Sequence, residues 1–306
     1  MSGPRGAADL YRVDAELSWA RDRLTLAGID SPGSDAEWLL ADALTVERGR
    51  LVLVDGLDEV QRSRFRAAVE QRAQRIPLQH IVGTAAFGPG ELAVGPGVFV
   101  PRPETEFLAE WAQAQTRTTV EPVIVDLCSG SGALAIALAV LVPAARVYAV
   151  ERSPDALEWL RHNVAASDAV ADRITVVDAD VTDPAQMSAV GLDGTVDVVV
   201  ANPPYVPLDA EVSPEVAHDP AEAVFGGVDG MAVIVPMMPI VASLLAPGGV
   251  VGVEHDDTTS AQVVAAIDGL GEFADVRAHR DLAGRPRFVT ARRVPGVRDG
   301  RGRMAP

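Results

Sequence analysis

A buried strand that runs into a pair of prolines constrains this chain more than any other stretch. Residues 196–201 hold five apolar residues in six positions, interrupted only by Asp197, which is typical of a strand covered on both faces. The four residues that follow are Asn-Pro-Pro-Tyr, from Asn202 to Tyr205. Each proline fixes its own φ, keeps the residue before it extended and lacks an N–H. The pattern predicts a sheet between two helical layers, with a rigid polar corner at the carboxyl end of one strand.

The groups at this corner suit a planar NH2 group, whose two hydrogens need two acceptors in fixed directions. The Asn202 side-chain oxygen and the Pro203 carbonyl can supply these acceptors, and Pro204 holds them in place. Tyr205 offers a flat apolar wall while its hydroxyl stays hydrogen-bonded. We therefore predict that these four residues are catalytic and serve the alkylation of a weakly nucleophilic NH2. A strand-ending turn without function is the alternative, because Asn-Pro often begins a turn.

Strands and helices alternate along the chain beyond residue 122. Strands are expected at residues 123–125, 146–150, 174–177, 196–201, 250–253, 275–279 and 287–291, and helices at residues 132–141, 154–166, 233–245 and 259–270. This alternation predicts a mostly parallel, doubly wound sheet of the α/β class. No helix separates the last two strands, so we expect them to form an antiparallel pair at the edge.

The N-terminal part of the chain is expected to form a small all-helical domain. Apolar residues recur at spacings of three and four over residues 10–24, which predicts a first helix. A capping box at residues 34–37 predicts the start of a second helix, and a third is expected from Asp58. The third helix is expected to turn these residues inward: Val60, Phe65, Ala68, Val69 and Ile76. Its other face is either solvated or a docking surface, and it carries Arg62, Arg64, Arg66, Arg72 and Arg75.

A stiff linker is expected between this domain and the sheet. Glycines punctuate residues 84–106, which predicts a hairpin-like segment. Two prolines around Arg102 hold its charged side chain at a fixed angle, although a linker stiffened by prolines needs no function. We expect a helical substrate-docking domain at residues 1–83, this linker, a catalytic domain at residues 107–293 and a disordered tail at residues 294–306.

A glycine-rich loop follows the first strand of the sheet. It begins with Asp126, and its small residues allow a ligand to approach the main chain closely: Cys128, Ser129, Gly130, Ser131 and Gly132. The loop is an imperfect fingerprint for NAD, because Ala135 stands at the third glycine position. The carboxylate of Asp126 would also repel a pyrophosphate, whereas it suits a cationic sulfonium or amino group.

Acidic residues also follow the second and third strands. Glu151 stands about 20 residues past the glycine loop, where an acid accepts hydrogen bonds from ribose hydroxyls. Asp180 is placed to meet an adenine edge, with Val181 as an apolar contact beside it. Together with Asp126 and Asn202, these residues outline one pocket for an adenosine that bears a positive charge. We therefore predict S-adenosyl-L-methionine as the cofactor, with S-adenosyl-L-homocysteine as its product, in preference to NAD.

Composition narrows the choice of partners. The 306 residues carry a net charge of −17, and residues 86–293 hold 12 arginines against 29 acidic residues. Such a field repels a phosphate backbone, so we expect no direct nucleic-acid partner. One cysteine and five scattered histidines predict neither a disulfide nor a metal site. The chain shows no export leader and no apolar run long enough to span a membrane, so we expect a cytoplasmic enzyme.

The proline corner, the glycine loop and the segment Pro101-Arg102-Pro103-Glu104-Thr105-Glu106 together resemble the HemK/PrmC family. These are the protein-(glutamine-N5) methyltransferases of peptide chain release factors. The resemblance extends over nearly the whole chain. The corner alone is shared with amino-group methyltransferases of DNA and RNA, whereas the proline-bracketed segment, the helical N-terminal domain and residues 219–227 are more particular to the family.

The resemblance implies a Rossmann-like, seven-stranded methyltransferase domain and roles for single residues. It implies that residues 128–132 and Glu151 hold S-adenosylmethionine, that Val181 lies by the adenine and that residues 202–205 grip a substrate glutamine. It also implies that this glutamine belongs to the Gly-Gly-Gln motif of release factors. Two residues depart from the family pattern: Cys128 stands where glycine is frequent, and Asp219 where glutamate is frequent.

Three functions follow from these patterns as alternatives. The first is methylation of the release-factor glutamine at N5. The second is methylation of an N6-adenine or N4-cytosine amino group in nucleic acid, which the acidic charge of the catalytic part disfavours. The third is an adenosine-binding module without catalysis. Methyl-transfer assays with release factor, with DNA and without an acceptor separate the three.

Overall fold

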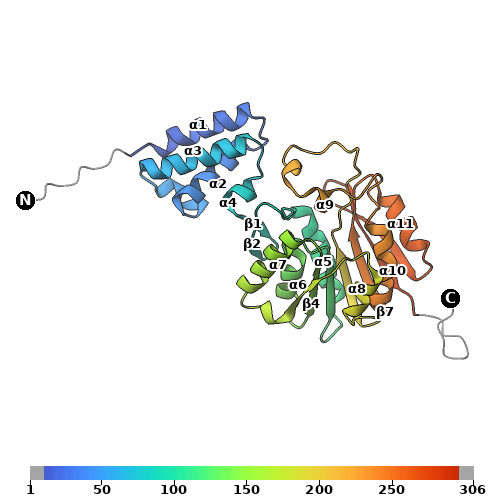
Figure 1. The fold of residues 1–306 in the computed structure, drawn as a ribbon. Coiled ribbons are helices and arrows are strands. Elements are labelled where there is room, and N and C mark those ends of the chain that lie inside the picture. The colour runs from blue at the N-terminus through green and yellow to red at the C-terminus, as the bar shows by residue number, and fades with distance from the viewer. Residues whose placement is uncertain (1–9, 296–306) are drawn as a thin grey trace, which may run out of the picture. The chain divides into compact units, whose positions relative to one another are not determined.

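The structure, a computed structural model, describes residues 10–295, so the tail predicted at residues 294–306 lies almost entirely outside the described part. The chain divides into two compact units, each with its own fold (Figure 1). The first comprises Met1–Thr84 together with Ser213–His218, and the second comprises Ala85–Val212 and Asp219–Pro306. Within residues 10–295, no helix is long and apolar enough to cross a membrane.

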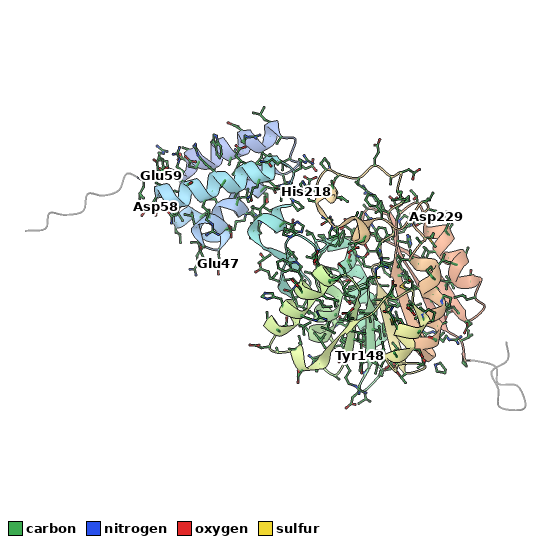
Figure 2. All side chains as sticks on the ribbon, viewed as in Figure 1. Glu47, Asp58, Glu59, Tyr148, His218 and Asp229 are labelled. Atoms are coloured by element: carbon green, nitrogen blue, oxygen red, sulfur yellow. The ribbon has the colours of Figure 1, made fainter. Side chains whose placement is uncertain are left out.

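The first unit is helical, and its elements are α1 (Val13–Leu26), α2 (Pro32–Leu44), the 3-10 helix η1 (Arg48–Leu53), α3 (Glu59–Ala73) and α4 (Leu78–Val82). Their apolar stripes enclose a core in which Leu24, Leu39 and Phe65 are fully buried. As predicted, α3 begins after Asp58, whose side chain accepts the N–H of Gln61 while the Gln61 side chain accepts the N–H of Asp58. Figure 2 labels Asp58 at this end of the unit.

Three sequence-based details of this unit are wrong. α2 begins at Pro32, because proline is preorganised for the first helical position, so Ser34 lies inside the helix and does not cap it. Leu10 precedes α1 and is 52% exposed. Val60 is 77% exposed instead of facing the core. It lies about two and a half helical turns before the fully buried Val69 and therefore points the opposite way.

The row of arginines on and after α3 is bound by acids of the same unit. The ion pairs are Arg62–Glu16 (2.8 Å), Arg66–Glu16 (2.8 Å), Arg64–Asp42 (3.0 Å), Arg72–Asp35 (2.7 Å), Arg72–Glu215 (3.0 Å) and Arg75–Glu215 (2.9 Å). A carboxylate as buried as Glu16 needs such partners, because burial of an unpaired charge costs several kcal/mol. The row is therefore an internal ion-pair network, which neither sequence-based interpretation anticipated.

A hairpin, a 3-10 turn and a helix precede the main sheet. β1 (Thr84–Phe87) pairs with β2 (Gly90–Ala93), and η2 (Pro103–Thr105) leads into α5 (Glu106–Gln115). The main sheet and its helices then follow, with the elements β3 (Val123–Leu127), α6 (Ala133–Leu141), β4 (Arg146–Glu151), α7 (Pro154–Ala166), η3 (Ala171–Arg173), β5 (Ile174–Asp178), α8 (Pro184–Ala189), β6 (Val196–Ala201), α9 (Ala221–Val224), α10 (Ile234–Leu244), β7 (Leu245–Glu254), α11 (Ser260–Asp268), β8 (Phe273–Arg280) and β9 (Pro286–Arg293). The 3-10 helix η4 (Val216–His218) lies in the segment that belongs to the first unit.

The main sheet has seven strands in the order β5-β4-β3-β6-β7-β9-β8. The strands from β5 to β7 run parallel, whereas β9 is antiparallel to both β7 and β8. The predicted α/β class and the antiparallel edge pair are confirmed. The short helices α8 and α9 were not predicted, because a few residues carry too little periodicity to be distinguished from loops.

Helices cover both faces of the sheet, with α5, α6 and α7 on one and α8, α10 and α11 on the other (Figure 1). Neighbouring residues of β3 enter different cores, because side chains alternate across a strand. Ile124 packs with the first set of helices and Val125 with the second, and both are fully buried. This double covering explains why the strands are almost continuously apolar.

The strand order reverses between β3 and β6. From β3 the chain proceeds outward through β4 to β5, and from β6 it proceeds to β7 on the other side. These strands are parallel, so their carboxyl ends share one edge of the sheet, where doubly wound sheets bind ligands at the point of reversal. Each of the predicted site residues belongs to, or closely follows, the carboxyl end of one of four neighbouring strands: β5, β4, β3 and β6.

Candidate active site

The glycine loop leaves β3 in a tight turn that is bonded to β4. Ser129 donates its N–H to the Val150 carbonyl at 3.0 Å, and Gly130 donates its N–H to Glu151 Oε2 at 2.9 Å. Gly132, at φ +89°, is the N-cap residue of α6, and a Cβ there would lie 2.7 Å from the Leu160 side chain. The loop therefore needs glycine both for its turn and for its packing against α7.

Asp126 has an acceptor that the protein leaves unused. Its side chain is buried, and Oδ2 accepts the Ala135 N–H at 3.1 Å. Its other oxygen, Oδ1, has no hydrogen-bond partner within residues 10–295. Burial, aided by the nearby Glu151 charge, raises the pKa of Asp126 to about 7. An unsatisfied buried carboxylate is what a cationic ligand requires, so Asp126 fits the amino group or sulfonium of S-adenosylmethionine.

Glu151 ends β4 with both carboxylate oxygens bonded to main-chain amides. Oε2 accepts from Gly130, while Oε1 accepts from Arg152 and Ser153 at 2.8 Å each. Two oxygens offer about four acceptor sites, so capacity for a ribose hydroxyl remains. Glu151 thus also orders the glycine loop, a structural task that its place in the sequence did not reveal.

Asp180 and Val181 are less available than the sequence suggested. Asp180 Oδ2 pairs with Arg152 at 2.9 Å, and Oδ1 accepts from both the N–H and the hydroxyl of Thr182. Burial acts to raise the pKa of Asp180, but the bonds from Thr182 and Arg152 outweigh it and the pKa is lowered. Val181 is 4% exposed and belongs to the core, so it offers little surface to an adenine.

Cys128 occupies a backbone conformation that favours glycine. Its φ is +62°, in the left-handed region where a Cβ is strained. Burial, with the charges of Glu151 and Asp126, raises the pKa of the thiol well above its ordinary value. The thiol therefore stays neutral and is a poor nucleophile toward a methyl donor.

The proline corner follows β6 directly and brings Asn202 against Thr105 of η2. Asn202 Nδ2 donates to the Thr105 hydroxyl oxygen at 3.2 Å. Within residues 10–295, no donor reaches Asn202 Oδ1, so this oxygen remains able to accept. Pro203 and Pro204 are buried, which fixes the carbonyls on either side of them.

Tyr205 is anchored by a carboxyl group that sequence reasoning missed. Its hydroxyl donates to Glu254 Oε1 at 2.9 Å. Burial is the main cause that raises the pKa of Glu254 to about 7. The signal was present, because Glu254 ends β7 in the way that Glu151 ends β4. Thr105 gave no such signal, since a threonine between two glutamates is unremarkable.

Glycines after α9 allow the main chain to pack against this corner. Val206 donates its N–H to the Val224 carbonyl at 3.0 Å, and Gly226 donates to the Val206 carbonyl at 2.9 Å. A Cβ on Gly226 would lie 2.5 Å from the Pro204 carbonyl oxygen, and one on Gly230 would clash with the Tyr205 carbonyl oxygen. Residues 224–230 therefore hold the corner by close main-chain contacts that larger residues would prevent.

Two domain families match separate parts of the chain. Residues 16–83 match the PrmC N-terminal domain, and residues 106–206 match the TRM5/TYW2 methyltransferase domain. A release factor glutamine methyltransferase from Mycolicibacterium smegmatis is 55% identical over 286 residues, covering 93% of this chain and 99% of that protein. The chain belongs to the HemK/PrmC family. The resemblance seen in the sequence is confirmed.

A second relative of this name matches over a similar length, and a solved structure is also similar. A release factor glutamine methyltransferase from Streptomyces coelicolor is 48% identical over 285 residues, covering 92% of this chain and 98% of that protein. A solved protein-(glutamine-N5) methyltransferase from Alicyclobacillus acidocaldarius is 25% identical, covers 66% of this chain and 99% of that one, and has a TM-score of 0.39. Membership in the HemK/PrmC family makes the chain an S-adenosylmethionine-dependent methyltransferase.

Proposed function

We propose that this protein transfers a methyl group from S-adenosylmethionine to the side-chain nitrogen of the glutamine in the Gly-Gly-Gln motif of peptide chain release factors. One observation carries the proposal at the level of residues. The Asn202 amide is bonded through its NH2 to Thr105, which leaves its oxygen to accept from an incoming NH2. Relatives at up to 55% identity carry the name of this activity over nearly their whole length.

We propose that the carboxyl edge of the sheet holds the cofactor, which supplies an electrophilic methyl group when bound. Asp126 would neutralise its positive charge, and Glu151 would accept from its ribose hydroxyls. The loop from Cys128 through Ser129, Gly130 and Ser131 to Gly132 would lie against it, with Asp180 and Val181 at the adenine end and Asn202 beside the methyl group.

Orientation and charge stabilisation are the chain's contribution to the reaction. An amide nitrogen is a poor nucleophile because its lone pair is delocalised. The Asn202 oxygen and the Pro203 carbonyl would accept its two hydrogens, align it in line with the methyl group and stabilise the positive charge that develops on nitrogen. Glu254 is not placed to act as a base on the substrate, because its carboxyl group is buried and accepts from the Tyr205 hydroxyl.

We propose a cytoplasmic protein substrate in preference to nucleic acid. Residues 86–293 carry 12 arginines and 29 acidic residues, and this excess of negative charge opposes binding of a phosphate backbone. Release factors act on ribosomes, which supports a cytoplasmic location for the reaction. Methylation of an amino group in nucleic acid is the alternative function. An enzyme of that kind would have the same corner at residues 202–205.

We propose that residues 1–83 dock the protein substrate, that residues 84–106 link the domains and that residues 107–293 carry the chemistry. The paired arginines of α3 leave apolar side chains as the candidates for docking. Val52 in η1 is 86% exposed and Leu53 is 77% exposed. Val52→Asp should raise KM for an intact release factor without changing cofactor affinity. Val120→Asp is the matched control, because Val120 is equally exposed but lies in the loop before β3.

A methyl-transfer assay with mass spectrometry of the acceptor tests the function. Full-length protein with S-adenosylmethionine and release factor should add one methyl group to the glutamine side chain. DNA and an acceptor-free reaction serve as the other arms. Transfer to DNA, or none to release factor at any protein concentration, would overturn the proposal.

A further inference from the structure

A buried carboxyl group on the neighbouring strand is bonded to the last residue of the proline corner. Glu254 is 3% exposed and ends β7. β7 runs parallel to β6, with Val253 paired to Ala201. The residues that follow this pair, Glu254 and Asn202, therefore come at the same edge of the sheet. From there Glu254 Oε1 accepts the hydroxyl of Tyr205 at 2.9 Å.

The side chain of Tyr205 is held at both of its ends. Pro203 and Pro204 restrict the main chain before it. Its own carbonyl oxygen packs so closely against Gly230 that a Cβ there would clash. At the far end, the hydroxyl is bonded to Glu254. Because the O–H of a phenol prefers to lie in the plane of its ring, the direction of this bond also selects the ring plane.

The hydrogen bond to Glu254 decides what Tyr205 can offer to a ligand. A tyrosine hydroxyl has one proton, and this proton is directed at Glu254. Tyr205 therefore offers a ligand the flat face of its ring and not its O–H. A carboxylate presents an acceptor oxygen whichever way it turns, whereas a glutamine amide has a single oxygen. Glutamate is thus well suited to holding a phenol hydroxyl in one direction.

The environment of Glu254 differs from that of a carboxylate buried for stability. Asp219 is such a carboxylate, and it is paired with Arg102 at 2.6 Å. Within residues 10–295, Glu254 forms no ion pair of this kind. Burial of a carboxyl group without a cationic partner is costly, and groups of this sort are concentrated at functional sites. The position of Glu254 against the corner therefore favours a role in the function of the corner.

We propose that Glu254 is a positioning residue for methyl transfer, which holds the ring of Tyr205 at the angle where its face supports the substrate NH2 group. Glu254 does not touch the reacting atoms and acts through the Tyr205 hydroxyl. The inference rests on the proposed function, because the substrate NH2 belongs to that reaction. A displaced ring would misalign the NH2 and slow the chemical step, whereas binding of the cofactor would not change.

Two single variants and their combination test whether Glu254 acts through the hydroxyl. Tyr205→Phe keeps the ring and removes the hydroxyl, and Glu254→Met keeps the length of the side chain and removes the acceptor. Each should lower kcat about tenfold, with the dissociation constant of S-adenosylmethionine within about twofold of wild type. The double variant should be no slower than either single variant, because both changes break one bond. Two independent structural defects would instead multiply.

A conservative variant and a matched control complete the kinetic test. Glu254→Gln keeps an acceptor oxygen on a side chain of the same length, so its kcat should stay within about threefold of wild type. Thr290→Val is the control, because the Thr290 hydroxyl is buried in the same sheet and lies 2.8 Å from His279 Nε2, away from the corner. Its kcat should be that of the wild type.

Tyrosine labelled with 13C at the ring carbon that bears the hydroxyl reports the bond without any reaction. The sequence holds three tyrosines, so three signals are expected from the full-length protein without cofactor or substrate. The Tyr205 signal is the one that Tyr205→Phe removes. Glu254→Met should move it, because the hydroxyl loses its acceptor, whereas the signals of Tyr11 and Tyr148 should stay fixed.

The two readouts separate this inference from the proposed function. Absence of methyl transfer by the wild type would overturn the function, and the 13C signal would still show whether Glu254 holds the Tyr205 hydroxyl. A Tyr205 signal that Glu254→Met does not move would overturn the inference. Wild-type kcat in Glu254→Met, a double variant slowed by the product of the two single effects, or an equal loss in Thr290→Val would do the same.

Discussion

Arg102 and Asp219 stand 117 positions apart in the chain and form an ion pair of 2.6 Å in which the Asp219 side chain is fully buried. Asp219 also accepts the Val100 N–H at 3.3 Å, so it ties the segment before η2 to the segment before α9. The guanidinium lies 4.8 Å above the Phe99 ring. The proline-bracketed Arg102 thus has a structural partner in Asp219. The two segments that this pair joins both lead to elements that contact the proline corner at residues 202–205.

Arg102→Met should lower the free energy of unfolding by about 2–3 kcal/mol, because Asp219 loses its cationic partner in a buried site. Chemical denaturation measures this loss. The double variant Arg102→Met with Asp219→Asn should recover part of it, since no buried carboxylate remains. A double variant that loses the full sum of the two single effects would show that the pair is not coupled.

Asp126→Asn should stabilise the cofactor-free protein above neutral pH and weaken cofactor binding. The pKa of Asp126 is about 7 in the folded state and about 3.9 in an unfolded chain, so between these values the folded state holds the extra proton. Wild-type stability from this group is therefore fully present below about pH 4 and is lost as pH rises to about 7.

The asparagine variant lacks this loss, because it cannot ionise. It should exceed the wild type by on the order of 1–3 kcal/mol at pH 8 and by nearly nothing at pH 4, measured by urea unfolding. Calorimetric titration at pH 8 should show weaker binding of S-adenosylmethionine. Unchanged binding would remove Asp126 from the proposed pocket.

Cys128→Gly should be neutral or stabilising by up to about 1 kcal/mol. It relieves the strain of φ +62°, and this gain is partly offset by the larger entropy of glycine in the unfolded chain. Gly130→Ala is the matched opposite test, because φ is +54° there and a Cβ would meet nothing within 4 Å. It should cost about 1 kcal/mol from backbone strain alone. Equal stability of all three proteins in thermal unfolding would contradict this account.

Asn202→Ala should lower kcat by on the order of a hundredfold, because it deletes one of two acceptors for the substrate NH2. Asn202→Asp keeps an acceptor of the same size but loses the bond that Nδ2 donates to Thr105, so its activity should lie between those of the alanine variant and the wild type. Both variants should bind S-adenosylmethionine about as well as wild type. An aspartate variant with most of the wild-type turnover would mean that the Nδ2 bond to Thr105 is dispensable.

Local patterns in the sequence were sufficient to predict the strands and the longer helices, and the candidate site residues lie at the ends of neighbouring strands. Runs such as residues 196–201 are almost entirely apolar because helices cover both faces of the sheet, and this pattern does not depend on the order of the strands. The rigid proline corner could also be predicted from local sequence, because Pro203 and Pro204 act on their own backbone and on the residue before them. Family membership followed from motifs of this local kind.

Contacts between distant residues were decided only by the tertiary structure. Thr105 and Asn202 are 97 positions apart, and Tyr205 and Glu254 are 49 apart, so no periodicity links them. The arginines of α3 looked like a free face because their acidic partners lie on other elements, as Glu16 does on α1. Burial of Asp126 and Glu254, which sets their pKa values, likewise depends on which helices pack over the strand ends. The sequence determined where charged groups stand along the chain, whereas only the fold determined which of them meet and how far water is excluded from them.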